Sequence, residues 1–147
     1  MKIKFKKLYK NVPTPRYVHQ GDAGLDLVAI QSERVSENGI RQYIEYKTGL
    51  CVEIPEGYAG LLFPRSSVTN KNLILGNCVG IIDSNYRGEI TFRYKILRDG
   101  IGENNIYEVG ERVGQIIIMP YPEVEFEEVE ELSDTPRGVS GYGSTGK

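Results

Sequence analysis

The chain has 147 residues, of which 39% are hydrophobic, so it is long enough for one domain with its own core. Its formal net charge of −2 gives no electrostatic reason to expect a nucleic acid as partner. Cys51 and Cys78 stand far apart, with no further Cys or His at metal-ligand spacing, which predicts reduced, buried thiols in a cytoplasmic protein. No stretch is apolar for long enough to cross a membrane, so no membrane association is expected.

The first half of the chain shows short strand patterns separated by prolines and glycines. Three strands are predicted there: residues 2–9, 44–54 and 58–63. Residues 31–42 are polar and predict a surface loop. Short strands of this kind, without a long helical period, predict a single all-β domain of sandwich or barrel type.

An aspartate lies within an apolar run in Ala23-Gly24-Leu25-Asp26-Leu27. A charged side chain between leucines needs a partner. Asp26 either caps neighbouring backbone amides or serves as a carboxylate near a cation or a catalytic water.

A guanidinium and two hydroxyls follow the strand 58–63, in Pro64-Arg65-Ser66-Ser67, before a short turn or helix over residues 66–72. Free backbone N–H groups beside an arginine can hold a phosphate. The alternative is a plain N-cap next to an exposed arginine.

The segment 80–96 predicts a β-hairpin, in which an apolar run meets Asp83, a turn follows over residues 84–88, and a second strand covers 89–96. A carboxylate at a strand end can be held in place and still reach solvent, which suits a base that deprotonates water. Alternatively, Asp83 hydrogen-bonds the backbone of its own turn. Asn77 offers the donor and acceptor needed to read a base edge, or is simply a turn residue.

The last third predicts a loop over 99–105, a possible short strand over 106–109, a strand over 112–120, and an acidic edge strand or solvated connector over 123–131. Gln115 lies inside the apolar strand and must find hydrogen-bond partners there or in a ligand. The glycine-rich end is either a disordered tail or a lid over a nucleotide.

Five ordered segments resemble the motifs of the trimeric dUTPases: residues 23–27, 64–67, 76–88, 112–115 and 137–146. The resemblance implies a compact, jelly-roll-like β fold with at most one short helix, with residues 1–132 as the single domain. Residues 133–147 would be a flexible arm that closes over an active site. It also implies a homotrimer with shared sites that hydrolyses dUTP to dUMP and diphosphate with Mg²⁺. Such hydrolysis keeps uracil out of DNA and supplies dUMP for dTMP synthesis.

The same resemblance assigns roles to individual residues. Asp83 matches the general base that activates the attacking water, Tyr86 packs under the deoxyribose, and Asp26 lies near the Mg²⁺ and acts through water. Uracil recognition falls to Asn77, Ile81 and Ile82, with Thr91 also lining the nucleoside site. The phosphate positions are Arg65, Ser66, Ser67, Gln115 and Arg137, and the remaining arm positions at the substrate are Tyr142, Gly143, Ser144 and Thr145.

The arm departs from the family pattern at Tyr142, where phenylalanine is usual, and at Val139-Ser140, where small residues or glycine are common. The nearest rival enzyme is dCTP deaminase, which uses a glutamate where this chain has Arg93. Arginine cannot act as that acid or base at neutral pH. A rival from another class is a nucleotide-gated binding protein, whose arm orders on dUTP and switches a partner interaction. A third interpretation treats both aspartates as turn caps and the tail as disorder.

Overall fold

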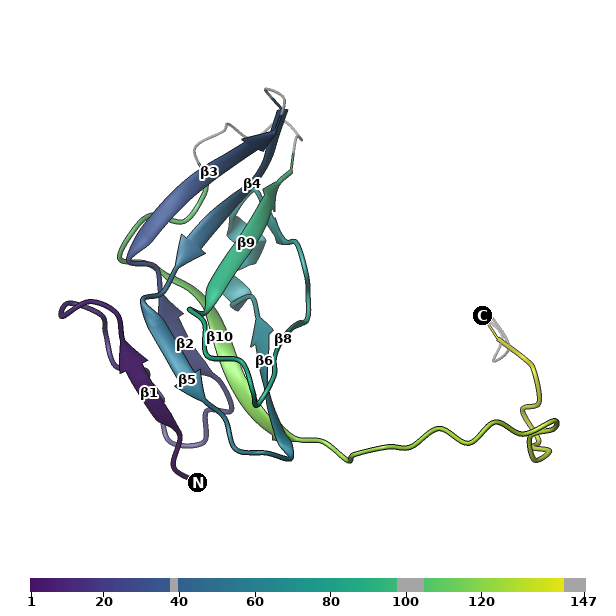
Figure 1. Ribbon diagram of the computed structural model, residues 1–147. Coiled ribbons are helices and arrows are strands. Elements are labelled where there is room, and N and C mark those ends of the chain that lie inside the picture. Colours follow the sequence, from purple (N-terminus) through teal and green to yellow (C-terminus); the bar gives the residue numbers. More distant parts are fainter. Residues whose placement is uncertain (38–39, 98–104, 142–147) are drawn as a thin grey trace.

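The computed structural model describes residues 1–37, 40–97 and 105–141 as an almost entirely β-stranded protein (Figure 1). Its strands are β1 (Lys4–Lys7), β2 (Leu25–Val28), β3 (Gln31–Glu37), β4 (Ile40–Lys47), β5 (Leu50–Glu53), β6 (Tyr58–Phe63), β7 (Leu73–Leu75), β8 (Gly80–Ile82), β9 (Thr91–Ile96) and β10 (Arg112–Pro120). One short 3₁₀ helix, η1 (Ser66–Asn70), follows β6. The predicted all-β class with at most one short helix is therefore confirmed. No helix in the described ranges is both long and apolar enough to cross a membrane.

The strands form two four-stranded sheets, ordered β2-β10-β6-β8 and β3-β4-β9-β7, and a small sheet of β1 and β5. The strand pairs are antiparallel. Strand β10 lies between β2 and β6, so it links the residues near Asp26 to the rest of its sheet. Figure 1 shows the chain after β10 running away from the body in an extended form.

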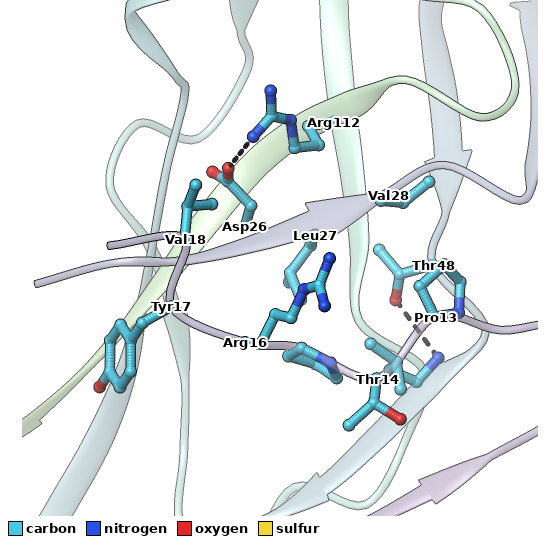
Figure 2. A pocket seen from close by; sticks show the side chains of 12 residues that line it. Pro13, Thr14, Arg16, Tyr17, Val18, Asp26, Leu27, Val28, Thr48 and Arg112 are labelled. Atoms are coloured by element: carbon cyan, nitrogen blue, oxygen red, sulfur yellow. Dashed lines mark hydrogen bonds and ion pairs between the residues drawn. The ribbon is translucent and has the colours of Figure 1, made fainter. Parts of the chain in front are cut away.

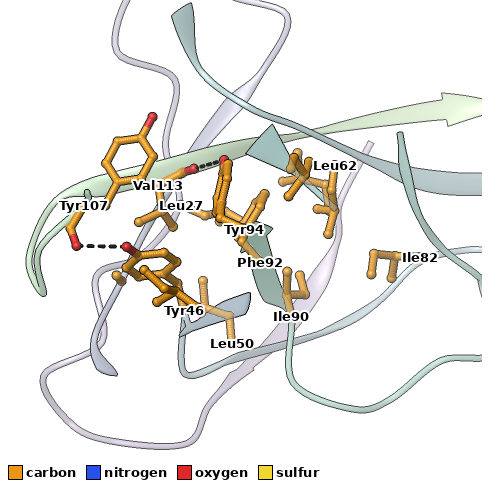
Figure 3. Close-up of a cluster of buried hydrophobic side chains, with 14 of the residues drawn as sticks. Leu27, Tyr46, Leu50, Leu62, Ile82, Ile90, Phe92, Tyr94, Tyr107 and Val113 are labelled. Carbon is orange, nitrogen blue, oxygen red and sulfur yellow. Dashed lines mark hydrogen bonds between the residues drawn. The ribbon is translucent and has the colours of Figure 1, made fainter. Parts of the chain in front are cut away.

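The core lies where side chains from both four-stranded sheets meet (Figure 3). On β9, Phe92 and Tyr94 are buried while Thr91, Arg93 and Lys95 face outward, as strand alternation requires. The Tyr94 hydroxyl donates to the Val113 carbonyl at 2.6 Å and so joins the two sheets. Burial of each such aromatic side chain contributes about 2–3 kcal/mol.

The predicted hairpin is wrong, because its two strands belong to different sheets. β8 pairs with β6, whereas β9 pairs with β4 and β7. The chain crosses between sheets at residues 83–90, and the Ile90 N–H donates to the Leu50 carbonyl at 2.8 Å. Ile82 and Phe92 consequently enter the same core from opposite sides.

Three further predictions in this region need correction. The polar residues 31–42 contain β3 and the start of β4, and the largely exposed edge strand β3 gave no apolar signal. The predicted strand 44–54 breaks at Gly49, which has a φ of 69° that favours glycine. Residues 106–109 form no strand, although Tyr107 is buried there.

The cysteines are less buried than predicted, and the acidic segment is exposed. Cys78 is exposed and Cys51 is partly buried, so the expected burial of both is wrong. Residues 123–131 are exposed and form no strand, which agrees with a solvated connector.

Candidate functional site

Two separate cavities contain most of the side chains that the sequence singled out. The first, called here the Asp26 cavity, has a volume of about 600 Å³. Its polar lining comes from β2, β10, the start of η1 with the residue before it, and the glycine turn that precedes β2. These residues are His19, Asp22, Asp26, Arg65, Ser66, Arg112 and Gln115.

Two guanidinium groups hold the Asp26 carboxylate. Arg65 Nε donates to Oδ1 at 2.8 Å, and Arg112 Nη1 donates to Oδ2 at 3.0 Å. The Asp26 side chain is only 15% exposed, because Leu27 beside it enters the core and fixes β2 against β10. In the part of the chain that the structure describes, the Asp26 carboxylate accepts from these two guanidinium groups and from no backbone amide, which favours a carboxylate near cations over a backbone cap.

Gln115 lies opposite Asp26 across the β10–β2 pairing. Its Nε2 donates to the Pro64 carbonyl at 3.2 Å, so this polar side chain has a hydrogen-bond partner although it lies in an apolar strand. Gly24 permits this position, because a Cβ at residue 24 would collide with the Gln115 Oε1. The glycine of the Ala-Gly-Leu-Asp run therefore makes room for a functional side chain.

A neighbouring cavity of about 570 Å³ lies on the other side of the Asp26–Arg112 pair (Figure 2). The entry segment that contains Pro13 and Pro15 forms one wall, and Thr48 lies at its far side. It shares Val18, Asp26 and Arg112 with the Asp26 cavity. The Asp26–Arg112 ion pair therefore lies between the two cavities.

The Asp26 cavity provides no protein cage for a metal ion. Within the described ranges, no group of three or more His, Cys, Asp and Glu side chains could hold one. A carboxylate has about four acceptor positions, so Asp26 can accept from both arginines and still accept a metal-bound water. The Asp26 carboxylate therefore fits a hydrated Mg²⁺ that is coordinated mainly by the oxygens of a bound ligand. The cavity does not fit a Mg²⁺ coordinated directly by several side chains.

The second cavity, called here the Asp83 cavity, has a volume of about 260 Å³ and lies between the end of β8 and the outer face of β9. It is lined by Leu62, Asn77, Ile81, Ile82, Asp83, Tyr86, Glu89, Thr91 and Arg93. The five residues expected at the nucleoside (Asn77, Ile81, Ile82, Tyr86 and Thr91) are thus brought together here with Asp83, the expected general base.

Asp83 follows β8 directly and is exposed to solvent. The turn after it is closed by its backbone carbonyl, which accepts from the Tyr86 N–H at 3.1 Å. No hydrogen bond to its carboxylate occurs among the residues that the structure describes, so the side chain does not cap its own turn. The Tyr86 hydroxyl donates to the Glu89 carbonyl at 3.0 Å, which fixes the ring at the cavity wall.

The two cavities share no lining residue. β2 and β8 are the opposite edges of one sheet, three strand spacings apart, a separation of about 14 Å. One copy of the chain therefore presents two separate cavities.

Some expected site residues lie in neither cavity. Ser67 Oγ is 3.2 Å from the Tyr107 hydroxyl and points into the protein. Arg137 lies on the extended segment, where its Nε donates to the Ser140 carbonyl at 3.1 Å. Four expected residues lie outside the described residues: Tyr142, Gly143, Ser144 and Thr145.

Two lining arginines were missing from the expected site. Arg112 begins β10 and reaches Asp26, whereas the sequence marked it only as the first residue of the motif segment 112–115 and gave it no role. Arg93 lines the Asp83 cavity, and strand alternation on β9 could have placed it on the same face as Thr91.

Comparison with known proteins relates both cavities to one family. The dUTPase family model matches residues 10–146. The deoxyuridine 5'-triphosphate nucleotidohydrolase of Corynebacterium glutamicum is 40% identical over 148 residues, which cover 99% of this chain and 95% of that relative. The enzyme of the same name from Thermobifida fusca is 36% identical over 99% of this chain and 79% of its own length.

Solved structures agree with these relatives. The dUTPase of Staphylococcus bacteriophage 80alpha, solved with the nucleotide analogue dUPNHPP, has a TM-score of 0.81 and 30% identity, with 99% of each chain covered. A dUTPase mutant from phage phi11 has a TM-score of 0.72 and 27% identity over 89% of this chain and 98% of its own. Because the match extends over nearly the whole chain and both cavities, the protein belongs to the dUTPase family.

Proposed function

We propose that the protein hydrolyses dUTP to dUMP and diphosphate, which limits the dUTP available for DNA synthesis. One observation carries this function: the family match includes both cavities, one with a free carboxylate and one with two arginines. The relatives' names and the dUTP analogue bound to the phage enzyme support the same substrate.

In the proposed reaction, Asp83 takes a proton from water, and the water oxygen forms a bond to the α-phosphorus. The bond between this phosphorus and the bridging oxygen breaks, and diphosphate leaves with the electron pair. Asp83 suits this role because its carboxylate is exposed and has no hydrogen-bond donor among the described residues. The uracil would lie against Asn77, Ile81 and Ile82, and the deoxyribose against Tyr86, with Thr91 nearby.

The Asp26 cavity would receive the phosphates. Arg65, Ser66 and Gln115 line it, and Ser67 would contribute only after turning away from Tyr107. The phage phi11 enzyme coordinates a structural Mg²⁺ ion. In this protein, Mg²⁺ would neutralise phosphate charge, with Asp26 holding one of its waters. Arg112 and Arg65 keep the Asp26 carboxylate in place for that water.

The separation of the cavities supports a site assembled from several copies, as in the trimer that the family resemblance implies. The Asp83 cavity of one subunit would face the Asp26 cavity of the next, because neither alone holds both the base and the phosphate ligands. The extended segment that carries Arg137 stands away from its own body (Figure 1), so its residues would reach a site on another subunit. The arm residues Tyr142, Gly143, Ser144 and Thr145 would close that site.

The test is diphosphate release from dUTP, dTTP, dCTP and UTP with Mg²⁺, for the wild-type protein and Asp83→Asn. We expect release from dUTP alone, reduced by about 10³-fold or more in the variant, because the amide cannot take the proton. Light scattering at the same concentrations measures the number of subunits. Tight dUTP binding without turnover by the wild type would contradict hydrolysis.

A second role, in which nucleotide binding gates a partner protein, is favoured by one observation. The phage 80alpha dUTPase, similar over 99% of both chains, is described as controlling transfer of virulence genes by a G protein-like mechanism. Binding of dUTP without turnover would move the function of this chain toward that role.

A further inference from the structure

Arg93 is held rigidly on the outer face of β9. It lies directly opposite Glu45 of β4, and its Nε donates to the Glu45 Oε2 at 2.7 Å. Its guanidinium also lies over the Tyr43 ring, 5.0 Å from the centroid. Two side chains of β4 therefore hold the Arg93 guanidinium. Because its rotamer freedom is already restricted, Arg93 loses less conformational entropy when it binds a ligand.

Arg93 is also the only cation among the described residues that line the Asp83 cavity. Two carboxylates, Asp83 and Glu89, share the lining, and Glu89 Oε1 already accepts from the Gly49 N–H at 2.6 Å. The Glu45 side chain is 13% exposed, whereas that of Arg93 is 58% exposed. The Arg93 guanidinium therefore covers the Glu45 carboxylate, while its own outer edge stays accessible to a ligand.

The backbone places Arg93 at one particular end of this cavity. The Gly76 N–H donates to the Arg93 carbonyl at 2.8 Å, so Arg93 lies beside the residue that precedes Asn77. The Asn77 side chain lies beside Gly80 at the start of β8, whereas Asp83 follows the last residue of β8. On the proposed function, the Asn77 end receives the base and the Asp83 end receives the sugar and α-phosphate.

We propose that Arg93 is a specificity-determining residue whose terminal amino groups donate to the C4 carbonyl oxygen of the uracil ring. Nη1 and Nη2 have no protein partner among the residues that the structure describes, so they are available for this contact. Uracil presents carbonyl acceptors at both C2 and C4, whereas cytosine presents an amino donor at C4. Arginine has five donors and no acceptor, so an amino group facing it leaves two donors unpaired. This inference rests on the proposed function and adds an active rejection of dCTP to it.

The experiment compares Arg93→Gln with the wild type by measuring kcat and KM for dUTP and dCTP. Glutamine can donate or accept, so it tolerates both bases. We expect the dUTP to dCTP ratio of kcat/KM to fall by about tenfold or more, chiefly through KM. Lys95→Gln removes a charge from the same face of β9 without touching the cavity, and it should leave the ratio unchanged.

A merely structural role for Arg93, as the counter-ion of Glu45, gives a different result. In that case Arg93→Gln lowers the melting temperature, the double variant with Glu45→Gln restores it, and the nucleotide ratio does not change in either. That outcome overturns the proposal. Calorimetric binding of dUMP and dCMP provides a readout without turnover. If the wild-type chain binds dUMP but releases no diphosphate, the proposed function fails, while the dUMP to dCMP binding ratio still decides the role of Arg93.

Discussion

Arg65 and Asp26 form a contact of 2.8 Å between Nε and Oδ1, and both side chains are more than three-quarters buried. An amide at residue 26 offers one acceptor oxygen, and its NH₂ group would face a guanidinium. We expect Asp26→Asn to destabilise the protein by about 1–3 kcal/mol and to lower dUTP hydrolysis by about 10–100-fold. Thermal unfolding and diphosphate release measure the two effects.

The exposed Lys4–Glu53 pair provides the control for this variant. Because that pair is on the surface and far from both cavities, Glu53→Gln should change neither the melting temperature nor the rate. An Asp26→Asn protein with the wild-type rate would show that Asp26 serves only to hold the arginines.

Gly24→Ala should damage the Asp26 cavity through Gln115. The added Cβ collides with the Gln115 Oε1, so the glutamine must turn and lose its bond to the Pro64 carbonyl. We expect KM for dUTP to rise by about tenfold or more, because a small misplacement of a binding group is costly. In a Gln115→Ala background the same change should add little. An equal effect in both backgrounds would mean that residue 24 acts through its backbone.

Stability should fall at alkaline pH because of buried tyrosines. Burial raises the pKa of Tyr46 from 10.0 to about 12. The unfolded chain releases this proton near pH 10, so the contribution is complete below pH 10 and is lost as pH rises toward 12. The slope is about 1.4 kcal/mol per pH unit for one such group.

Urea unfolding between pH 9 and 12 measures this slope. Burial also raises the pKa of Tyr94, so the wild type should lose stability through both hydroxyls. Tyr46→Phe should be less stable at neutral pH but should show a shallower decline. A decline as steep as in the wild type would exclude Tyr46 as a titrating group.

Deletion of residues 133–147 should separate folding from catalysis. The described part of this segment is exposed, and the hydrogen bonds within it are local, such as the one from the Gly138 N–H to the Thr135 carbonyl at 3.0 Å. We expect the melting temperature to change by less than about 3 °C and hydrolysis of dUTP to fall by about 100-fold or more. A large drop in melting temperature would instead place the segment within the folded unit.

Apolar patterns located β6 and β10 and missed the polar strand β3. Strands β6 and β10 have the predicted bounds because apolar residues fill them. β3 is polar and exposed, so only backbone pairing with β4 defines it. The predicted hairpin failed because a turn after Asp83 is compatible with return to the same sheet or passage to the facing one. Only packing of the core, which involves residues far apart in sequence, selects the second.

The same limit applies to the site. The motif order anticipated Asp26, Arg65 and Gln115 as neighbours, which the structure brings into one cavity. It did not anticipate Arg112 as the second partner of Asp26, because that contact depends on the pairing of β10 with β2, which motif order does not show. Nor could spacing along the chain show that Asp83 and Asp26 lie at opposite edges of a sheet.

That arrangement of the two cavities has a genetic consequence. If a complete site takes one cavity from each of two subunits, a chain with a damaged Asp83 and another with a damaged Arg65 are each inactive alone. Expressed together in one cell, the two chains would form mixed assemblies. At some interfaces, the intact Asp83 cavity of one chain would meet the intact Asp26 cavity of the other. Two null alleles would then complement each other, as defects in a self-contained monomeric enzyme could not.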